Sequence, residues 1–531
     1  MINLEKRTLG ELALKAAKKY KKKAAFRVFR ERGVYNELNY TEFGRRARIF
    51  AWFLINKGIK INDRVMILAE NCPEWPIAYF GIALAGAVSV PVLTDFTEEQ
   101  MYSIAQHSQV SCVCVTERTM DKAARLINTL PYFILNNEEL FSNEKEDFKE
   151  AENSLNDINT KDHDPASIIY TSGTTGFSKG VVLSHKNLIS TSLASRSFMK
   201  IYPRDRVLSV IPLAHTYECT IGLLTPLLSG ASITYLDKPP SPSIMLPAMQ
   251  AVRPTAMITV PLFIEKIYHG LILPKLENNP LYKWRITRNI VIKAAGHSLL
   301  AAMGSSLRFF GIGGAALAED TEIFLKKSGF PYSIGYGLTE TSPLVTATTP
   351  YRFPLRSSGR AIPGVEIRIS EEEEIQVRGP NVMMGYFRDE DQTTKAFTPD
   401  AWFKTGDLGY LDKKGNLYIR GRLKALIVGP SGENVYPEEI ESMLHSSFLV
   451  EDALVIPGSK GELVALIVLS EKAQTAFAAL AEMLEDLKQN INKRLAIFSR
   501  INRIEVHNEP FEKTPTRKIK RFLYQENNSK N

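Results

Sequence analysis

The sequence predicts an α/β protein with a large N-terminal domain of parallel α/β sheets, a small β-barrel-like subdomain and a small α+β C-terminal domain. Three observations predict this architecture. Helix-like and strand-like stretches alternate over residues 8–115, as they do in a parallel sheet with helical crossovers. Short strands separated by tight turns replace this pattern over residues 362–419. A fresh mixture of strands and a helix begins at residue 421.

Capping signals and apolar spacing indicate the first two helices. Thr8 and Glu11 form a capping box, which is expected to begin the first helix. Thr41 is expected to open the second helix, which ends near Gly58. The second helix carries apolar residues on one face: Phe43, Ala47, Phe50, Ala51 and Leu54.

Strands and helices then follow in turn. Strands are expected at residues 65–68, 88–93 and 110–115, with helices after Pro73 and from Thr97. The longest uncharged stretch, residues 75–94, is nearly long enough to span a membrane. It contains two prolines and divides into a helix-like and a strand-like half, so it is expected to be a buried core segment.

The second half of the chain predicts the remaining elements. Strands are expected at residues 365–369, 375–377, 417–419, 453–456 and 464–469, a helix at residues 477–495, and surface segments at residues 136–164 and 371–374. The domain boundary is placed at residues 421–424, which gives domains of residues 1–420 and 421–531.

The composition is that of a globular protein with at least one large core. The chain has 531 residues, of which 44% are hydrophobic and 23% charged, which excludes a disordered or fibrous protein. The net charge of +8 suits an anionic partner but is small for this length. The four cysteines are too few for a disulfide framework, and no signal-peptide core stands at the N-terminus, so a reducing, cytoplasmic compartment is expected.

The stretch YTSGTTGFSKG, residues 170–180, has the composition of a phosphate-binding loop. Its glycines let backbone N–H groups turn toward an anion, its hydroxyls donate hydrogen bonds, and Lys179 adds a positive charge. It does not match the Walker pattern, because Gly180 follows the lysine where that pattern has Ser or Thr. The alternative, a flexible linker, needs no lysine and does not follow a buried strand.

Four further stretches carry candidate ligand-binding residues. GYGLTETS, residues 335–342, contains Glu340, a hard oxygen ligand suited to Mg²⁺. TGD, residues 405–407, ends in Asp407, which can accept hydrogen bonds from both hydroxyls of a ribose. GRLK (421–424) and KTPTRKIKR (513–521) supply cations. The two carboxylates can also be ordinary caps, and the second basic stretch can be a solvated charge run.

Taken in order, these motifs resemble those of the adenylate-forming superfamily, which contains acyl-CoA synthetases, luciferases and peptide-synthetase adenylation domains. The resemblance covers nearly the whole chain. It implies a loop that cradles the β and γ phosphates of ATP, formed by Thr171, Ser172, Gly173, Thr174, Thr175, Gly176 and Lys179. It also implies an adenine-facing turn at Gly314 and Ala315.

The same resemblance assigns the other nucleotide contacts. Tyr336, followed by Gly337, corresponds to the aromatic residue that stacks on adenine. Thr339 and Glu340 correspond to the α-phosphate and Mg²⁺ positions. Asp407 corresponds to the ribose carboxylate, with Arg422 close behind it.

The resemblance further makes the C-terminal domain mobile. Lys518 corresponds to the lysine that contacts the acid and the α-phosphate during adenylation, and Lys424 to the hinge. Two residues depart from the family pattern: Arg517 stands where a glycine usually precedes this lysine, and Ala425 where an acidic residue often follows the hinge.

The segment PLAHTYE, residues 212–218, resembles the acyl gate of fatty-acid ligases, which places His215 among the catalytic candidates. The alternative is a histidine satisfied within the core. Residues 221–228 can line an acyl tunnel or simply pack in the core, and the prediction is a fatty acid of medium or long chain.

The segment SGENVYPEEIE, residues 431–441, resembles the border of the pantetheine path, with Gly432, Glu433 and Asn434 facing coenzyme A. The expected reaction is therefore ATP- and Mg²⁺-dependent formation of an acyl-adenylate, followed by thioester formation with coenzyme A. Three alternatives stay open: transfer to acyl carrier protein, an adenylating enzyme of another class (an acyl-AMP ligase or luciferase-like monooxygenase), and a non-catalytic nucleotide-binding module.

No nucleic-acid partner is expected. Basic and aromatic residues gather at residues 45–53 and 282–293, where they can rest on a membrane surface or form the solvated faces of buried helices. The expectation is peripheral attachment at most, at the inner face of a membrane. The oligomeric state is left open, with a homodimer as one alternative.

Overall fold

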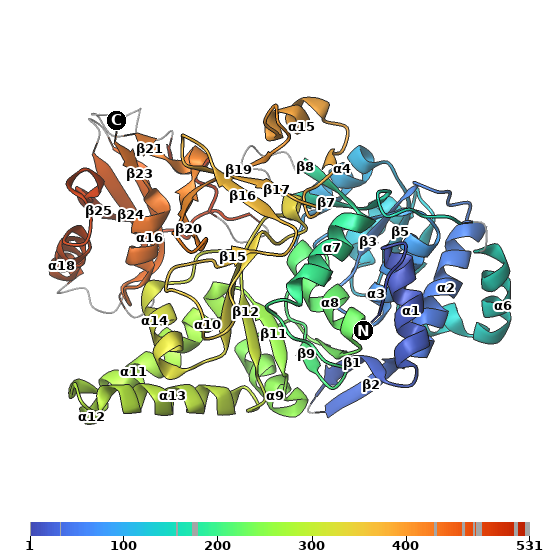
Figure 1. Cartoon of the computed structure of the whole chain (residues 1–531), viewed down its shortest axis with the longest axis horizontal. Helices are drawn as coiled ribbons and strands as arrows, with labels where there is room; N and C mark the ends of the chain where they lie inside the picture. Colours follow the sequence, from blue (N-terminus) through green and yellow to red (C-terminus); the bar gives the residue numbers. More distant parts are fainter. Residues whose placement is uncertain are drawn as a thin grey trace.

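The computed structural model describes residues 2–31, 33–155, 158–171, 179–428, 433–458, 462–470, 473, 480–514 and 519–525. Two large sheets and their helices form the N-terminal body, and the C-terminal elements stand beside it at one end (Figure 1). The four cysteines are free, and Cys112 and Cys114 are fully buried on one strand. Among the described residues, no helix is long and apolar enough to cross a membrane.

The first large sheet has seven strands in the order β18-β8-β7-β4-β3-β5-β6. Its central strands are parallel, and β8 and β18 add an antiparallel edge. The strands are β3 (Arg64–Leu68), β4 (Val88–Pro91), β5 (Val110–Val115), β6 (Tyr132–Ile134), β7 (Pro165–Thr171), β8 (Lys179–Ser184) and β18 (Gly385–Tyr386).

The second large sheet has nine strands in the order β15-β14-β13-β12-β11-β9-β10-β1-β2, parallel from β13 to β1. Sequence reasoning missed its β1–β2 hairpin. The strands are β1 (Ala24–Arg30), β2 (Gly33–Asn39), β9 (Arg206–Leu208), β10 (Ser232–Leu236), β11 (Ala256–Thr259), β12 (Phe309–Ile312), β13 (Tyr332–Tyr336), β14 (Thr346–Ala347) and β15 (Arg360–Ala361).

Helices cover these sheets and bury one extensive core, which includes most residues of α3. Helix α3 and strand β4 come from the long uncharged stretch, which is buried as predicted. The helices here are α1 (Leu9–Tyr20), α2 (Tyr40–Asn56), α3 (Glu74–Leu84), α4 (Glu98–Ser108), α5 (Ala124–Ile127), α6 (Glu144–Ser154), α7 (His185–Ser195), the π-helix η3 (Glu218–Leu224) and α8 (Thr225–Ser229).

One helix start differs from the prediction. Helix α2 begins at Tyr40 and is capped by Asn39, whose side chain accepts from the Glu42 amide at 2.9 Å while the Glu42 carboxylate accepts from the Asn39 amide. Thr41 therefore lies inside the helix. An Asn–Glu pair caps a helix as well as a Thr-based pair does. Because the hairpin strand β2 ends at Asn39, the helix begins directly after that residue.

A long connection joins β11 to β12 of the second sheet and consists of several helices. It contains α10 (Pro261–Ile267), the π-helix η4 (Tyr268–Ile272), α11 (Leu273–Glu277), α12 (Pro280–Lys283) and α13 (Arg288–Ala302). Together with α9 (Pro242–Val252) and α14 (Glu319–Ser328), these helices enclose a second core that contains Phe310, Phe330 and Tyr332.

A four-stranded antiparallel sheet follows the large sheets, as the short-strand pattern predicted. It consists of β16 (Glu366–Ile369), β17 (Glu374–Arg378), β19 (Phe403–Leu411) and β20 (Leu417–Arg422), with α15 (Glu390–Ala396) beside it. Residues 371–373 form the predicted turn, but Glu374 is buried at the start of β17.

The C-terminal region has its own core around a three-stranded sheet, β23-β24-β25. Its elements are η6 (Leu423–Ala425), β21 (Ile427–Val428), β22 (Asn434–Val435), α16 (Pro437–His445), β23 (Val450–Pro457), β24 (Leu463–Leu469), α18 (Leu480–Asn492), η9 (Ile497–Ser499), β25 (Arg503–Val506) and α19 (Phe522–Gln525). The predicted hinge, Lys424, lies in η6 directly after β20. The domain division at residues 421–424 remains a prediction.

Candidate functional site

The predicted nucleotide-site residues that the structure describes lie at the end of β7 and the start of β8, at the end of β13, on the turns after β12 and β13, and on the paired strands β19 and β20. The carboxyl ends of parallel strands are where α/β proteins bind ligands, because helix N-termini and free backbone N–H groups meet there. Several predicted residues lie outside the described residues and stay predictions: Ser172, Gly173, Thr174, Thr175, Gly176, Gly432 and Lys518.

Lys179 and Glu340 are joined through Tyr386. The Tyr386 hydroxyl donates to Glu340 Oε1 at 3.0 Å, and Lys179 Nζ lies 4.8 Å from the centre of the Tyr386 ring. Lys179 also donates to Gln392 Oε1 at 2.8 Å. Burial, with the adjacent Glu340 charge, holds the pKa of Tyr386 well above its ordinary value, so its hydroxyl stays protonated and donates.

Strand pairing produces this contact. Tyr386 of β18 lies opposite Val181 of β8, two residues beyond Lys179. The Met383 amide donates to the Glu340 carbonyl at 2.8 Å, which holds the short helix η5 (Thr339–Thr341) against the same segment. The predicted phosphate-site lysine and metal-site carboxylate therefore face the same side of the fold.

Asp407 has two partners that the sequence analysis placed in the same site. Its Oδ2 accepts from the Tyr336 hydroxyl at 2.7 Å, and its Oδ1 lies 2.7 Å from Arg422 Nε. Asp407 is buried, and Arg422 sits opposite it in the β19–β20 ladder. Burial alone lowers the pKa of the Arg422 guanidinium, but the Asp407 charge, together with Tyr336, Glu438 and Glu340, outweighs it and the pKa is raised. Adenine stacking by Tyr336 stays a prediction.

Glycines shape the turns beside β12 and β13. Gly314 has a φ of +89°, a backbone conformation that favours glycine, and Ala315 beside it is exposed. At Gly337 the constraint is space, since a Cβ would lie 1.7 Å from the Pro343 carbonyl oxygen. The backbone between Tyr336 and Thr339 can therefore take this path only with glycine at position 337.

His215 lies half-buried at the end of the loop after β9, and the Tyr217 amide approaches its Nδ1 at 3.2 Å. Tyr217, which sequence reasoning did not single out, packs beside the predicted adenine turn: its ring is 3.3 Å from where a Cβ of Gly313 would be. The structure thus brings the predicted acyl-gate segment to the predicted adenine turn. The gate role of His215 stays a prediction.

A small apolar cavity of about 10 Å³ lies between η3 and the strands β12 and β13. It is lined by Phe198, Tyr217, Ile221, Phe309, Gly311, Ser333, Gly335, Leu344 and Ala347. Of the segment predicted as tunnel wall or core, Ile221 lines the cavity, whereas Leu223, Leu224, Leu227 and Leu228 are fully buried in the main core. Core packing is therefore found for these residues, Ile221 included, and the acyl-tunnel role stays a prediction.

Glu218 is an ionisable group buried beside this cavity. Its carboxyl packs against Gly222, where a Cβ would lie only 2.3 Å from Glu218 Oε1. Neither carboxyl oxygen has a hydrogen-bond partner of good geometry among the described residues. Burial raises the pKa of Glu218 to about 8, against the opposing influence of the Ser209 hydroxyl and the Ile211 amide. The carboxyl is therefore neutral at pH 7.

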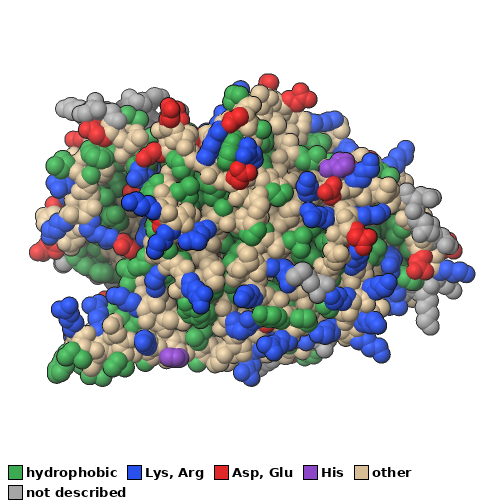
Figure 2. Space-filling view, viewed as in Figure 1, with side chains coloured by type: hydrophobic (Ala, Val, Ile, Leu, Met, Phe, Trp, Pro, Cys, Tyr) green, Lys and Arg blue, Asp and Glu red, His purple; other side chains and the backbone are tan. Residues whose placement is uncertain are grey.

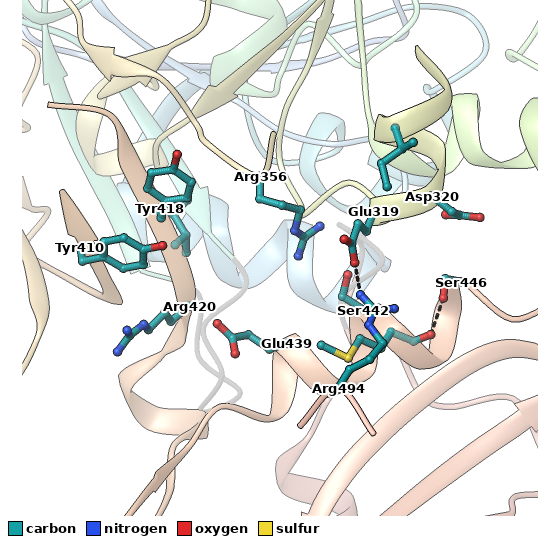
Figure 3. Close-up of a pocket in the computed structure, with 13 residues that line it drawn as sticks. Glu319, Asp320, Arg356, Tyr410, Tyr418, Arg420, Glu439, Ser442, Ser446 and Arg494 are labelled. Atoms are coloured by element: carbon teal, nitrogen blue, oxygen red, sulfur yellow. Dashed lines mark hydrogen bonds and ion pairs between the residues drawn. The ribbon is translucent and has the colours of Figure 1, made fainter. Parts of the chain in front are cut away.

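A larger polar cavity of about 440 Å³ separates the N-terminal body from the C-terminal region (Figure 3). Arg356 and Glu319 border it on one side, and Glu439 and Arg494 on the other, with Arg494 paired to Glu319 across the gap (Figure 3). The predicted coenzyme A residue Asn434 pairs with Val428 in a short hairpin near the hinge, and Glu433 directly precedes it.

Comparison with known proteins decides the family. A family model described as AMP-binding enzyme matches residues 14–387, and a model described as AMP-binding enzyme C-terminal domain matches residues 424–529. The chain belongs to the AMP-binding enzyme family.

Relatives within the AMP-binding family carry ligase names. The long-chain-fatty-acid–CoA ligase FadD15 of Mycobacterium tuberculosis is 30% identical over 476 residues, covering 83% of this chain and 78% of that protein. The human long-chain-fatty-acid–CoA ligase ACSBG1 is 28% identical over 490 residues, covering 83% of this chain and 68% of that protein.

Solved structures confirm the fold. ATP-bound MatB from Rhodopseudomonas palustris matches with a TM-score of 0.78 at 25% identity, covering 98% of both chains. The o-succinylbenzoate CoA synthetase MenE from Bacillus subtilis, solved with an acyl-adenylate, matches with a TM-score of 0.75 at 22% identity, covering 97% of this chain and 98% of that chain. The predicted α/β architecture with a separate C-terminal part is thereby confirmed.

The residues present fit a Mg²⁺ ion at Glu340. Mg²⁺ usually takes one or two protein carboxylates and completes its coordination with water and phosphate oxygens, rather than binding in an all-protein cage. The described residues contain no cluster of three or more His, Cys, Asp or Glu side chains placed to hold a metal. Glu340 uses Oε1 for Tyr386 and is half-buried.

Proposed function

We propose that this protein activates a fatty acid with ATP, through an acyl-adenylate, and then forms a thioester with coenzyme A, releasing AMP and pyrophosphate. One observation carries the proposal: Lys179 and Glu340 are linked through Tyr386, while Asp407 is held by Tyr336 and Arg422. These contacts support the proposal that Lys179, Glu340 and Asp407 are the phosphate-binding, metal-binding and ribose-binding groups of one nucleotide site.

The first step joins two anions. A carboxylate oxygen of the acid bonds to the α-phosphorus, and the bond from that phosphorus to pyrophosphate breaks. Negative charge accumulates on the phosphate oxygens, so the site must provide fixed positive charge. Lys179 and Lys518 would provide it, and Mg²⁺ held by Glu340 would neutralise further charge when bound. No protein nucleophile is required.

The second step transfers the acyl group to sulfur. The coenzyme A thiolate bonds to the acyl carbon, the carbon–oxygen bond to AMP breaks, and AMP leaves. Lys518 must withdraw to admit the thiol, which assigns Lys424 the role of hinge and the stretch from Gly432 to Asn434 the border of the thiol path. Domain movements of this kind occur on microsecond to millisecond timescales.

The fatty-acid assignment rests on the named relatives and on the apolar cavity. Phe198, Tyr217 and Phe309 give that cavity an aromatic lining suited to an alkyl chain. A cavity of about 10 Å³ has room for about one water molecule, so an acyl chain enters only after lining side chains move. Medium and long chains are the proposed substrates.

Two further points complete the proposal. Acyl carrier protein shares the pantetheine arm of coenzyme A and is the second candidate acceptor. Contact with a membrane is peripheral at most.

The test measures AMP release from ATP and Mg²⁺ over a chain-length series of fatty acids, with and without coenzyme A. The expected result is strong release only with coenzyme A, together with acyl-CoA by mass spectrometry. Lys518→Ala should lower adenylation on the order of 100-fold. Lys520→Ala is the matched control, because Lys520 belongs to the same basic stretch but pairs with Glu512 at 3.1 Å.

Two outcomes would contradict parts of the proposal. An acyl-adenylate burst without turnover on coenzyme A would move the acceptor to a carrier protein or another nucleophile. Absence of any ATP-dependent product with every acid would leave a nucleotide-binding module.

A further inference from the structure

We propose that the tip formed by residues 280–293 docks this protein on the surface of an anionic lipid bilayer. This α12–α13 tip comprises α12, the turn after it and the first turns of α13. It lies at the outer edge of the molecule (Figure 1). The inference concerns binding to lipid and holds whether or not the proposed ligase activity is correct.

The tip exposes large apolar side chains to an unusual degree. Ile286 is 89% exposed, Trp284 69%, Ile290 67% and Leu281 53%. In the space-filling view, apolar side chains gather at the corner where Figure 1 shows α12, with Lys and Arg side chains beside them (Figure 2). Single exposed apolar residues are common on soluble proteins, but four within ten consecutive positions mark an interaction surface.

Local contacts hold these side chains outward. The Thr287 hydroxyl donates to the Leu281 carbonyl at 2.5 Å, and the Arg288 amide donates to the Trp284 carbonyl at 2.9 Å. The Arg288 guanidinium lies 4.7 Å from the centre of the Tyr282 ring. Leu276 before the tip and Ile292 at its end are buried in the second core. The exposure is therefore part of a folded turn.

The positive charge of the tip favours a negatively charged membrane as its partner. Residues 278–302 contain no Asp or Glu, and their cations are Lys283, Arg285, Arg288 and Lys293. Apolar and aromatic groups that insert at the headgroup level, surrounded by Lys and Arg, are the composition that binds anionic membranes. An equally exposed aromatic elsewhere, Phe448, is followed by Glu451 and Asp452 and lacks this complementarity.

The other basic aromatic segment of the sequence does not form such a surface. In helix α2, Arg46 lies 5.1 Å from the centre of the Phe141 ring and Arg48 lies 5.5 Å from that of Phe148. Phe148 belongs to α6, which packs along α2. Residues 45–53 are thus covered by the protein's own chain, and the α12–α13 tip is the surface left available.

The tip lies on the chain segment that leads into a strand lining the apolar cavity. The tip belongs to the β11–β12 connection, and β12 supplies Phe309 and Gly311 to the cavity lining. If the proposed fatty-acid activity is right, docking would hold the acyl-binding sheet close to the bilayer in which fatty acids dissolve. This last step rests on the proposed function.

The experiment is vesicle flotation of the full chain without ATP, acid or coenzyme A. Vesicles contain phosphatidylcholine alone or an equimolar mixture with phosphatidylglycerol. The wild-type protein should float with the mixed vesicles and remain largely unbound with phosphatidylcholine alone. W284S/I286S should lower partitioning at least about tenfold, and K283E/R285E roughly 30-fold or more on the anionic vesicles.

Two matched controls separate the tip from general surface effects. Phe448→Ser removes a comparably exposed aromatic side chain, and K413E/K414E makes the same change in net charge on an exposed turn. Both should bind vesicles like the wild type. Because the substituted tip residues are exposed, thermal melting should confirm that all variants fold.

Three results would overturn the proposal. The first is recovery of the wild-type protein unbound from both vesicle types, and the second is flotation of the tip variants to the same extent as the wild type. The third is a wild-type dimer, seen by sedimentation without lipid, that W284S/I286S converts to a monomer; the tip is then a contact between two copies. Retained ATP-dependent activity in tip variants that no longer float would leave the proposed function intact.

Discussion

The Tyr386 hydroxyl donates a 3.0 Å hydrogen bond to Glu340, and the same ring lies beneath Lys179 at 4.8 Å. One side chain therefore positions both the proposed metal ligand and the proposed phosphate-binding lysine. Groups that orient a metal ligand typically contribute 10- to 100-fold to metal affinity or activity.

Tyr386→Phe should keep the ring but release Glu340. We expect about a tenfold loss of adenylation and a higher Mg²⁺ requirement, measured by pyrophosphate exchange at several Mg²⁺ concentrations. Tyr410→Phe, at a partly exposed tyrosine stacked on Tyr418, is the control and should be silent. Equal Mg²⁺ dependence in Tyr386→Phe and wild type would show that this hydrogen bond does not position Glu340.

Among the described glycines, Gly337 is the one at which an added methyl group meets backbone most closely. A Cβ would lie 1.7 Å from the Pro343 carbonyl oxygen, so Gly337→Ala must displace the turn between Tyr336 and Thr339. We expect a loss of about 3 kcal/mol in the free energy of unfolding, measured in urea, together with loss of ATP binding. Gly270→Ala is the control, because no atom lies within 4 Å of its Cβ position.

Glu218 should make stability fall as pH rises. Burial raises its pKa from 4.5 to about 8 in the folded protein, so between these values the native state keeps a proton that the unfolded chain releases. Across that interval this group lowers the free energy of unfolding by about 1.4 kcal/mol per pH unit, and the full cost is reached above pH 8.

Glu218→Gln removes this titration. The difference in melting temperature between the variant and the wild type should shift in favour of the variant from pH 5 to pH 8, whatever constant cost the buried amide adds. Glu371→Gln, at an exposed turn, should leave the wild-type pH profile unchanged. A Glu218→Gln profile parallel to that of the wild type would show that the folded protein does not hold Glu218 protonated.

The Arg494–Glu319 ion pair joins the C-terminal region to α14 in the present orientation. Both side chains are partly exposed, so the pair should contribute at most about 1 kcal/mol. Arg494→Ala should leave the melting temperature nearly unchanged but alter, by up to about fivefold, the ratio of acyl-adenylate formation to thioester formation. The R494E/E319R exchange should restore that ratio, unless the pair plays no part in setting the domain orientation.

The sequence predicted those parts of the fold and site that depend on neighbouring residues. Strand and helix patterns identified the parallel sheets, and the motif order placed Asp407 near Arg422, which face each other in one antiparallel ladder. It did not reveal Tyr386 or Gln392. Gln392 contacts a lysine 213 positions away, and the contact exists only because β18 pairs with β8. The residues around position 386 contain no pattern that predicts the pairing of β18 with β8.

The lining of the apolar cavity also could not be predicted from the sequence. Tyr217 and Ile221, four positions apart, line the apolar cavity, while Glu218 between them is buried and packs against Gly222. Helical periodicity can place Tyr217 and Ile221 on one face, but it cannot show that Phe309, Gly311 and Leu344, which are distant in sequence, complete the cavity.

The two partners of Asp407 have one more consequence. Arg422 is the last residue of β20, and the turn containing the predicted hinge begins at Leu423. A ribose that takes both carboxylate oxygens must compete with Arg422 and Tyr336 for them. Binding of the nucleotide at the proposed site would then weaken the Asp407–Arg422 ion pair directly before the predicted hinge. Binding of ATP and release of AMP would therefore favour different orientations of the C-terminal domain.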